Sequence, residues 1–236
     1  LDQLGGRHAY VVQGGAAVRR PIQAGASSLA AVEIVSGLEP GERVVVAGSE
    51  LFDNAEEVRH LIDATVPSGA RVGLAPTSQA TSLVDLLGAL LAERPVALLP
   101  PEADGGELAV AAQCAATIAD GRLQPLRDGA ARVALATADS PERVVLFTSG
   151  STRLPRGVRL SEANLLSNLT AMRGVGAAGW TPADRVGQIL TLAHSFGLSM
   201  ALLALAARSP LVMLPDTVPS RRLGSTLTDA GVTVLA

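Results

Sequence analysis

Residues 148–158 of this 236-residue chain read TSGSTRLPRGV, directly after an apolar run, RVVLF, at residues 143–147. The run is typical of a buried β-strand. The segment after it combines hydroxyl side chains with Gly150, Gly157 and the cation Arg156. Glycine lets backbone N–H groups approach a phosphate closely, and a guanidinium matches its charge. We therefore predict a strand that leads into a polyphosphate-binding loop, although the spacing differs from that of the common P-loop.

Strand-like and helix-like segments alternate around this loop from about residue 70 onward. Apolar runs predict strands at residues 71–76, 95–100, 144–147, 188–193, 211–214 and 232–235. Helical spacing of apolar residues predicts helices at residues 81–92, 107–119, 161–172, 198–207 and 221–230. Such alternation indicates an α/β fold with a mostly parallel sheet flanked by helices.

The first 60 residues have a different character. Short alternating segments are separated by turn signals such as Gly14-Gly15 and Pro40-Gly41. This pattern predicts a small β-barrel or β-sandwich. The character changes near Asp63, so we predict a β-rich segment at residues 1–60 and an α/β domain at residues 62–236.

Composition excludes several classes of function. The net charge of −3 and the pI of about 5.6 argue against a general nucleic-acid binder, which would carry a basic excess. Cys114 is the single cysteine, so no internal disulfide forms, and we interpret it as a small core residue in the helix predicted at 107–119. The histidines, His8, His60 and His194, are too scattered to predict a metal site.

Two ordered motifs resemble those of one known family. The loop at 148–158, followed by LSEANLL at 160–166, resembles the signature of the adenylate-forming enzymes, which include acyl-CoA synthetases and acyl-carrier-protein ligases. The segment LAHSFGL at 192–198 resembles the substrate-side motif of the same family. The resemblance runs from about residue 62 to the end of the chain.

This resemblance implies an ATP-dependent ligase that uses Mg²⁺. Such an enzyme joins a carboxylic acid, here expected to be a fatty acid, to AMP, and then passes the acyl group to a thiol of CoA or of an acyl-carrier protein. The implied ATP-binding residues are Thr148, Ser149, Gly150, Ser151, Thr152, Arg156 and Gly157. The implied substrate-binding residues are His194, Phe196 and Gly197.

The chain departs from the family pattern at several positions. Arg153 stands where the family has a glycine, and Arg156 stands where it has a lysine. The family's adenine and ribose motifs, its magnesium-binding glutamate and its catalytic lysine would lie after Ala236. We therefore expect a truncated, N-terminal portion of a ligase, with no complete catalytic set and no activity as an isolated chain.

A second resemblance covers the first quarter of the chain. Residues 18–25, VRRPIQAG, and residues 32–48 resemble the membrane-proximal domain of periplasmic adaptor (membrane fusion) proteins of efflux pumps. This implies a binding module that contacts a membrane transporter, as an alternative to the ligase. It also implies a periplasmic location, whereas an ATP-dependent ligase implies the cytoplasm, and both hypotheses stay open here.

A rival enzyme class comes from AHSFG at 193–197, which fits a variant of the hydrolase nucleophile elbow. That mechanism needs an acid and then a histidine downstream of the serine. Asp216 and Asp229 follow, but no histidine follows His194, so the triad is not completed in its usual order.

Overall fold

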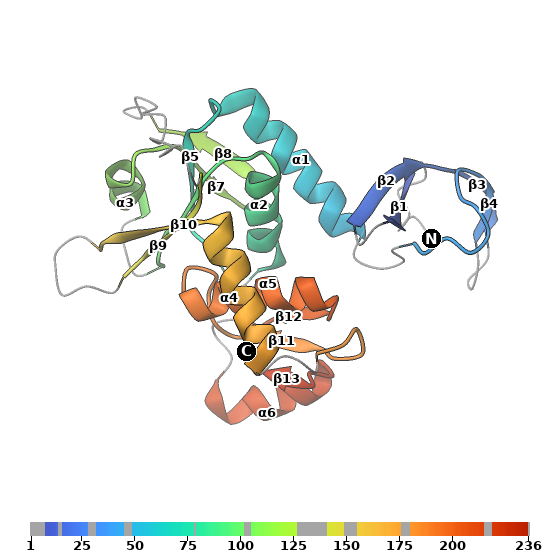
Figure 1. The fold of residues 1–236 in the computed structure, drawn as a ribbon. Coiled ribbons are helices and arrows are strands. Elements are labelled where there is room, and N and C mark those ends of the chain that lie inside the picture. The colour runs from blue at the N-terminus through green and yellow to red at the C-terminus, as the bar shows by residue number, and fades with distance from the viewer. Residues whose placement is uncertain are drawn as a thin grey trace. The chain divides into compact units, whose positions relative to one another are not determined.

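A computed structural model describes residues 8–13, 16–27, 32–44, 49–77, 79–101, 105–126, 141–148, 155–175, 180–214 and 219–235 (Figure 1). The chain divides into two compact units, residues 1–56 and 57–236, and the division falls within helix α1 (Ser49–Thr65). The assignment of domains to residues 1–60 and 62–236 stays a prediction.

The first unit contains two antiparallel pairs of strands. Strand β1 (His8–Gln13) pairs with β2 (Ala16–Pro21), and β3 (Gln23–Ser27) pairs with β4 (Val32–Ser36). Among the described residues these are separate two-stranded sheets, so the predicted barrel or sandwich is not confirmed.

Residues 49–60 were predicted as part of the β-rich segment, and that prediction is wrong because they belong to α1. The sequence does carry a helical signal here. Ala55, Val58 and Ile62 are all buried, and their spacing places them on one face of a helix. His8 on β1 lies 2.7 Å from Asp53 on α1, which ties the first part of α1 to the first unit.

A six-stranded sheet forms the centre of the second unit, in the order β10-β9-β6-β5-β7-β8. Its strands are β5 (Arg71–Leu74), β6 (Val96–Leu98), β7 (Cys114–Ala119), β8 (Arg122–Pro125), β9 (Glu142–Phe147) and β10 (Gly157–Ser161). The strands β9, β6, β5 and β7 are parallel, whereas each edge strand runs antiparallel to its neighbour. The sheet is therefore mixed rather than wholly parallel, because both edge strands return through hairpins.

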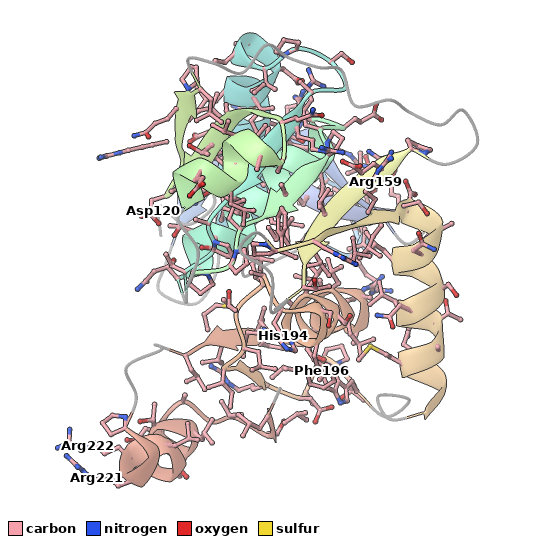
Figure 2. The ribbon with its side chains drawn as sticks, turned by 90° about the vertical axis from the view of Figure 1, so that its left-hand side faces the viewer. Asp120, Arg159, His194, Phe196, Arg221 and Arg222 are labelled. Atoms are coloured by element: carbon pink, nitrogen blue, oxygen red, sulfur yellow. The ribbon has the colours of Figure 1, made fainter. Side chains whose placement is uncertain are left out.

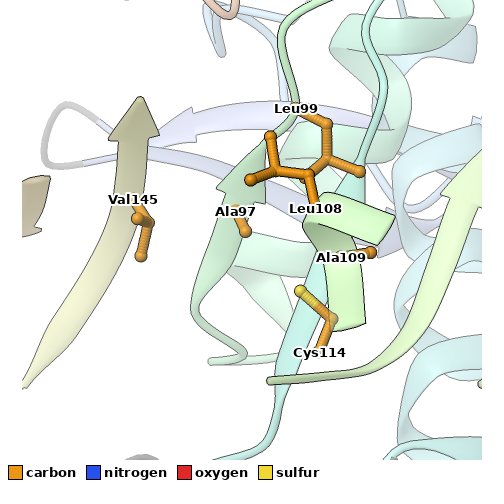
Figure 3. Close-up of a cluster of buried hydrophobic side chains, with 6 residues drawn as sticks. All are labelled: Ala97, Leu99, Leu108, Ala109, Cys114 and Val145. Carbon is orange, nitrogen blue, oxygen red and sulfur yellow. The ribbon is translucent and has the colours of Figure 1, made fainter. Parts of the chain in front are cut away.

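Helices α2 (Ala80–Leu91) and α3 (Gly105–Ala111) pack against this sheet. Figure 3 shows one core cluster in which α3 meets the sheet. It is formed by Ala97, Leu99, Leu108, Ala109, Cys114 and Val145. Burial raises the pKa of the Cys114 thiol to about 12, so it stays protonated and acts as a small apolar side chain.

The predicted helix at 107–119 is wrong beyond Ala111, because Cys114 begins strand β7. Gln113 has a positive φ of 58°, a left-handed conformation that cannot continue a helix. The alanines that favour a helix locally are used in the sheet, where alternate residues of β7 are buried.

The second unit also contains a three-stranded parallel sheet, in the order β12-β11-β13. Its strands are β11 (Val186–Gln188), β12 (Leu211–Met213) and β13 (Val234–Leu235), and the helices beyond the loop are α4 (Glu162–Val175), α5 (Ser195–Ala207) and α6 (Ser220–Asp229). Helix α5 packs against α4, β11 and β12. The single sheet expected for this region is thus two sheets. Within the described ranges, no helix is both long enough and apolar enough to cross a membrane.

Candidate functional site

The predicted phosphate loop connects β9 to β10. Phe147, the last residue of β9, pairs with Gly157, the first residue of β10. One residue further on, the backbone N–H of Thr148 donates to the carbonyl of Arg156 at 2.9 Å, and the Thr148 hydroxyl lies 3.4 Å from the same oxygen. Hydrogen bonds thus fasten the two ends of the loop together, while Ser149, Gly150, Ser151, Thr152 and Arg153 lie outside the described residues.

Gly157 packs closely against side chains of β9 at the base of the loop. A Cβ atom at Gly157 would lie 3.0 Å from Cγ1 of Val145 and 3.4 Å from the ring of Phe147, tighter than ordinary contact. The sequence pattern indicated glycine for close approach to phosphate, and the described structure adds this side-chain reason. The neighbouring Arg156 is exposed, and no ion pair joins it to another described residue.

The other end of the hairpin is held by a buried carboxylate that the sequence analysis missed. Glu142 receives hydrogen bonds from Arg71 at 2.5 and 2.9 Å and from Arg159 at 2.5 Å. Burial would raise the pKa of Glu142, but the hydrogen bonds and charge of Arg71, followed by those of Arg159, outweigh it and hold the pKa below its usual value. The one sequence signal was an acidic residue at the start of an apolar strand.

The predicted substrate residues gather at the start of α5. His194 is the N-cap residue, and its Nδ1 accepts a hydrogen bond from the backbone N–H of Phe196 at 3.3 Å. As an acceptor, Nδ1 carries no proton, so the proton of the neutral ring lies on Nε2. Figure 2 shows His194 and Phe196 close together, and both are exposed.

Gly197 and Gln188 shape the turn before α5. A Cβ atom at Gly197 would lie 2.2 Å from the carbonyl oxygen of Thr191 and 3.0 Å from that of Leu190, so the turn accepts only glycine there. The buried Gln188, which the sequence analysis did not single out, donates from Nε2 to the carbonyls of Leu190 and Gly197. Gly197 thus has a structural role in addition to its predicted place beside the substrate.

The two groups of predicted residues lie on different elements of the second unit, the first on the β9–β10 hairpin and the second at the start of α5. No hydrogen bond or ion pair between described residues joins Thr148, Arg156 or Gly157 to His194 or Phe196. The nucleophile-elbow alternative also lacks its geometry, because β11 ends at Gln188 and a turn separates it from Ser195. Within the described ranges, no three His, Cys, Asp or Glu side chains are grouped to hold a metal ion.

The model of the family described as AMP-binding enzyme matches residues 22–236. The mitochondrial malonate–CoA ligase ACSF3 of Xenopus laevis is 35% identical over 77 residues, which are 32% of this chain and 13% of that ligase. A CoA ligase of Gibberella moniliformis is 39% identical over 79 residues, which are 33% of this chain and 13% of that ligase.

Solved structures also match the fold. ATP-bound MatB from Rhodopseudomonas palustris superposes with a TM-score of 0.63 and 26% identity, over 79% of this chain and 43% of MatB. VinN in complex with 3-methylaspartate has a TM-score of 0.63 over 79% of this chain and 57% of VinN. Because the two sequences are only 19% identical, this likeness shows a shared fold and nothing more. The chain therefore spans less than half of MatB and a small share of the two ligases. The predicted resemblance of residues 1–60 to periplasmic adaptors is not shown by these comparisons, and the family match begins within that segment, at residue 22.

Proposed function

Because the chain belongs to the AMP-binding enzyme family, we propose that it forms the part of an ATP-dependent acid–thiol ligase that holds the triphosphate of ATP. In the first step of such a reaction, a carboxylate oxygen attacks the α-phosphorus of ATP and pyrophosphate leaves. In the second step, a thiol sulfur attacks the acyl carbon and AMP leaves. The chain's contribution to the first step is to bind and orient the phosphates.

The observation that carries this proposal is the hairpin β9–β10. Its base is fixed by Glu142 and Arg159, and the ends of its loop are fixed by Thr148 and the Arg156 carbonyl. Fixed loop ends reduce the conformational entropy that the chain must lose when a phosphate binds between them. The exposed Arg156 supplies a charge-assisted donor at the edge of the loop.

The proposed acid-binding side is the turn at 190–197. Phe196 is 47% exposed at the start of α5, and it offers an apolar surface to an acyl chain. His194 lies beside it and offers a polar Nε2–H group. We propose a carboxylic acid, in the first instance a fatty acid, as the substrate, and CoA or an acyl-carrier protein as the thiol acceptor.

Mg²⁺ is proposed to accompany ATP and to neutralise phosphate charge. The described residues supply no group of acidic side chains for a metal, so their proposed part is to bind phosphate. We propose the cytoplasm as the location of this reaction, because ATP is available there. The adaptor hypothesis for residues 1–60, with its transporter contact and periplasmic location, stays a prediction that no observation in the fold favours.

Calorimetric titration of the 236-residue chain tests the proposal with three ligands: ATP, inorganic tripolyphosphate and adenosine. If the loop binds phosphates, ATP and tripolyphosphate bind with similar affinity and adenosine binds far more weakly. Raising the salt concentration weakens the binding of ATP and of tripolyphosphate, because salt screens the contacts of an exposed Arg156. Equal binding of adenosine and ATP would contradict a phosphate-binding role for this loop.

A further inference from the structure

The side chain of Gln188 lies at the centre of the turn that carries His194 and Phe196. Gln188 ends the middle strand of the three-stranded sheet and is only 1% exposed. Its Nε2 group donates to the carbonyl of Leu190 at 2.5 Å and to the carbonyl of Gly197 at 3.0 Å. One amide group therefore joins the entry of the turn to the first turn of α5.

The orientation of this amide is set by its neighbours. An amide oxygen placed between the carbonyl oxygens of Leu190 and Gly197 would be repelled by both, so the NH₂ group must face them. The Oε1 atom of Gln188 then points away from them, and it has no hydrogen-bond partner among the described residues. A buried acceptor without a partner lowers stability, and a leucine of similar size would avoid that cost.

Other bonds in the turn depend on the same geometry. The backbone N–H of His194 donates to the carbonyl of Thr191 at 3.0 Å, and the backbone N–H of Leu198 donates to the carbonyl of His194 at 2.9 Å. Gly197 approaches the Thr191 carbonyl so closely that no side chain fits there. Movement of the Gly197 carbonyl would therefore shift the direction in which His194 and Phe196 project.

We infer that Gln188 is a positioning residue for the acid-binding side, acting by holding the turn that presents His194 and Phe196. It does not itself contact the substrate in this account. The inference rests on the proposed function, because that proposal assigns His194 and Phe196 to the acid. The NH₂ group of Gln188 fixes two carbonyls that an apolar side chain would leave without this donor.

Hydrogen exchange of the backbone amides tests this inference in the full 236-residue chain. The variants are Gln188→Leu, which keeps the volume but has no donor, and Asn168→Leu as a matched control. Asn168 on α4 donates to the Ser199 hydroxyl on α5 at 2.7 Å, so the control also removes a side-chain hydrogen bond to α5. With Gln188→Leu, we expect the amides of His194 and Leu198 to exchange about tenfold faster than in the wild type, because two bonds across the turn are lost.

Gln188→Glu provides a readout that a space-filling role would not change. An ionised carboxylate at this position is repelled by the carbonyl oxygens of Leu190 and Gly197, so the turn opens. A protonated carboxyl group donates one hydrogen bond to these carbonyls and restores part of the contact. Protection of the His194 and Leu198 amides, corrected for intrinsic exchange, should therefore increase as the pH falls. The increase should exceed any seen in the wild type and in Asn168→Leu, which share every other titrating group with Gln188→Glu.

A ligand titration separates failure of the inference from failure of the proposed function. Octanoate is titrated into each variant in the presence of ATP. We expect Gln188→Leu to lower the affinity for octanoate and to leave the affinity for ATP unchanged. If the wild type binds neither ligand, the proposed function fails, and the exchange data still decide whether Gln188 holds the turn. The inference is overturned if exchange at His194 and Leu198 is no faster in either Gln188 variant than in Asn168→Leu.

Discussion

Glu142 and Arg71 form a two-bond ion pair across the six-stranded sheet, although 71 positions separate them in the sequence. The Glu142 side chain is only 2% exposed, and Arg71 also donates to the carbonyl of Ala112 at 2.7 Å. Arg159 on β10 bonds the same carboxylate. One acidic group therefore ties β5, the loop before β7, β9 and β10 together at the base of the hairpin that carries the proposed phosphate loop.

Replacing Glu142 with Gln should lower the free energy of unfolding by about 3 kcal/mol, because it leaves a largely buried Arg71 without its counter-charge. Since folding lowers the pKa of Glu142, its contribution is present above the unfolded pKa and is lost as the pH falls through the folded pKa. The difference between wild type and variant, measured by urea unfolding, should thus shrink in acid below about pH 4. Glu162→Gln, which breaks an exposed pair with Arg143, is the control and should change stability by less than about 1 kcal/mol.

Asp85 on α2 makes stability depend on pH in the direction opposite to that of Glu142. It is fully buried, its Oδ1 accepts the backbone N–H of Gly121 at 3.0 Å, and desolvation raises its pKa to about 6. Stability from this group is therefore fully present below the unfolded pKa and is lost as the pH rises through about 6. Asp85→Asn keeps an acceptor for Gly121, so its unfolding free energy should fall less than that of the wild type between about pH 4 and pH 7. Parallel pH profiles for the two proteins would contradict the assignment.

Gly197→Ala tests the close approach in the turn before α5. Because the new Cβ atom would lie 2.2 Å from the Thr191 carbonyl, we expect a loss of about 1 to 3 kcal/mol in unfolding free energy. Gly224→Ala on α6 is the matched control, since a Cβ atom there meets nothing within 4 Å. That change should stabilise the helix by about 0.5 to 1 kcal/mol. Thermal unfolding compares the two variants, and equal effects would show that the turn can adapt.

Catalytic turnover by the isolated chain provides a further test. Because the chain spans 43% of MatB, we propose that it binds ATP without completing the adenylation. Pyrophosphate release with magnesium-ATP and a panel of carboxylic acids should stay at the level without acid. Release that depends on one of the acids would show that the described elements suffice for the chemistry.

The strand positions could be predicted from the sequence where apolar runs are short and bounded by turn residues. The runs around Val96–Leu98 and Glu142–Phe147 became the buried strands β6 and β9, whereas the strand predicted at residues 188–193 is wrong beyond Gln188, where β11 ends. Periodicity failed where local preference and tertiary context disagree. The segment at 114–119 is rich in alanine, yet it forms β7 because it pairs with β5 and β8. The pairing with β5 depends on residues far along the chain and has no local signal. The hairpin with β8 does have one, because Asp120-Gly121 forms its turn with positive φ values of 50° and 71°.

The candidate site could be predicted only at its motif residues. Thr148, Arg156, His194 and Phe196 stand out by residue type and order, and their roles stay predictions. The residues that hold them did not stand out. Gln188 is a single polar residue at the end of a short strand, and its importance depends on carbonyl groups whose positions only the fold reveals.

Binding of ATP to a charge-deleted loop tests the central claim most directly. Arg156→Ala should make the free energy of ATP binding less favourable by about 1 to 3 kcal/mol in low-salt calorimetry, because a charge-assisted phosphate contact is removed. Arg122→Ala, at the opposite edge of the six-stranded sheet, removes an exposed arginine remote from the loop and should leave the affinity unchanged. A selective loss in Arg156→Ala that diminishes with salt is the predicted result. Unchanged affinity in Arg156→Ala, or equal losses in both variants, would contradict the phosphate-binding account.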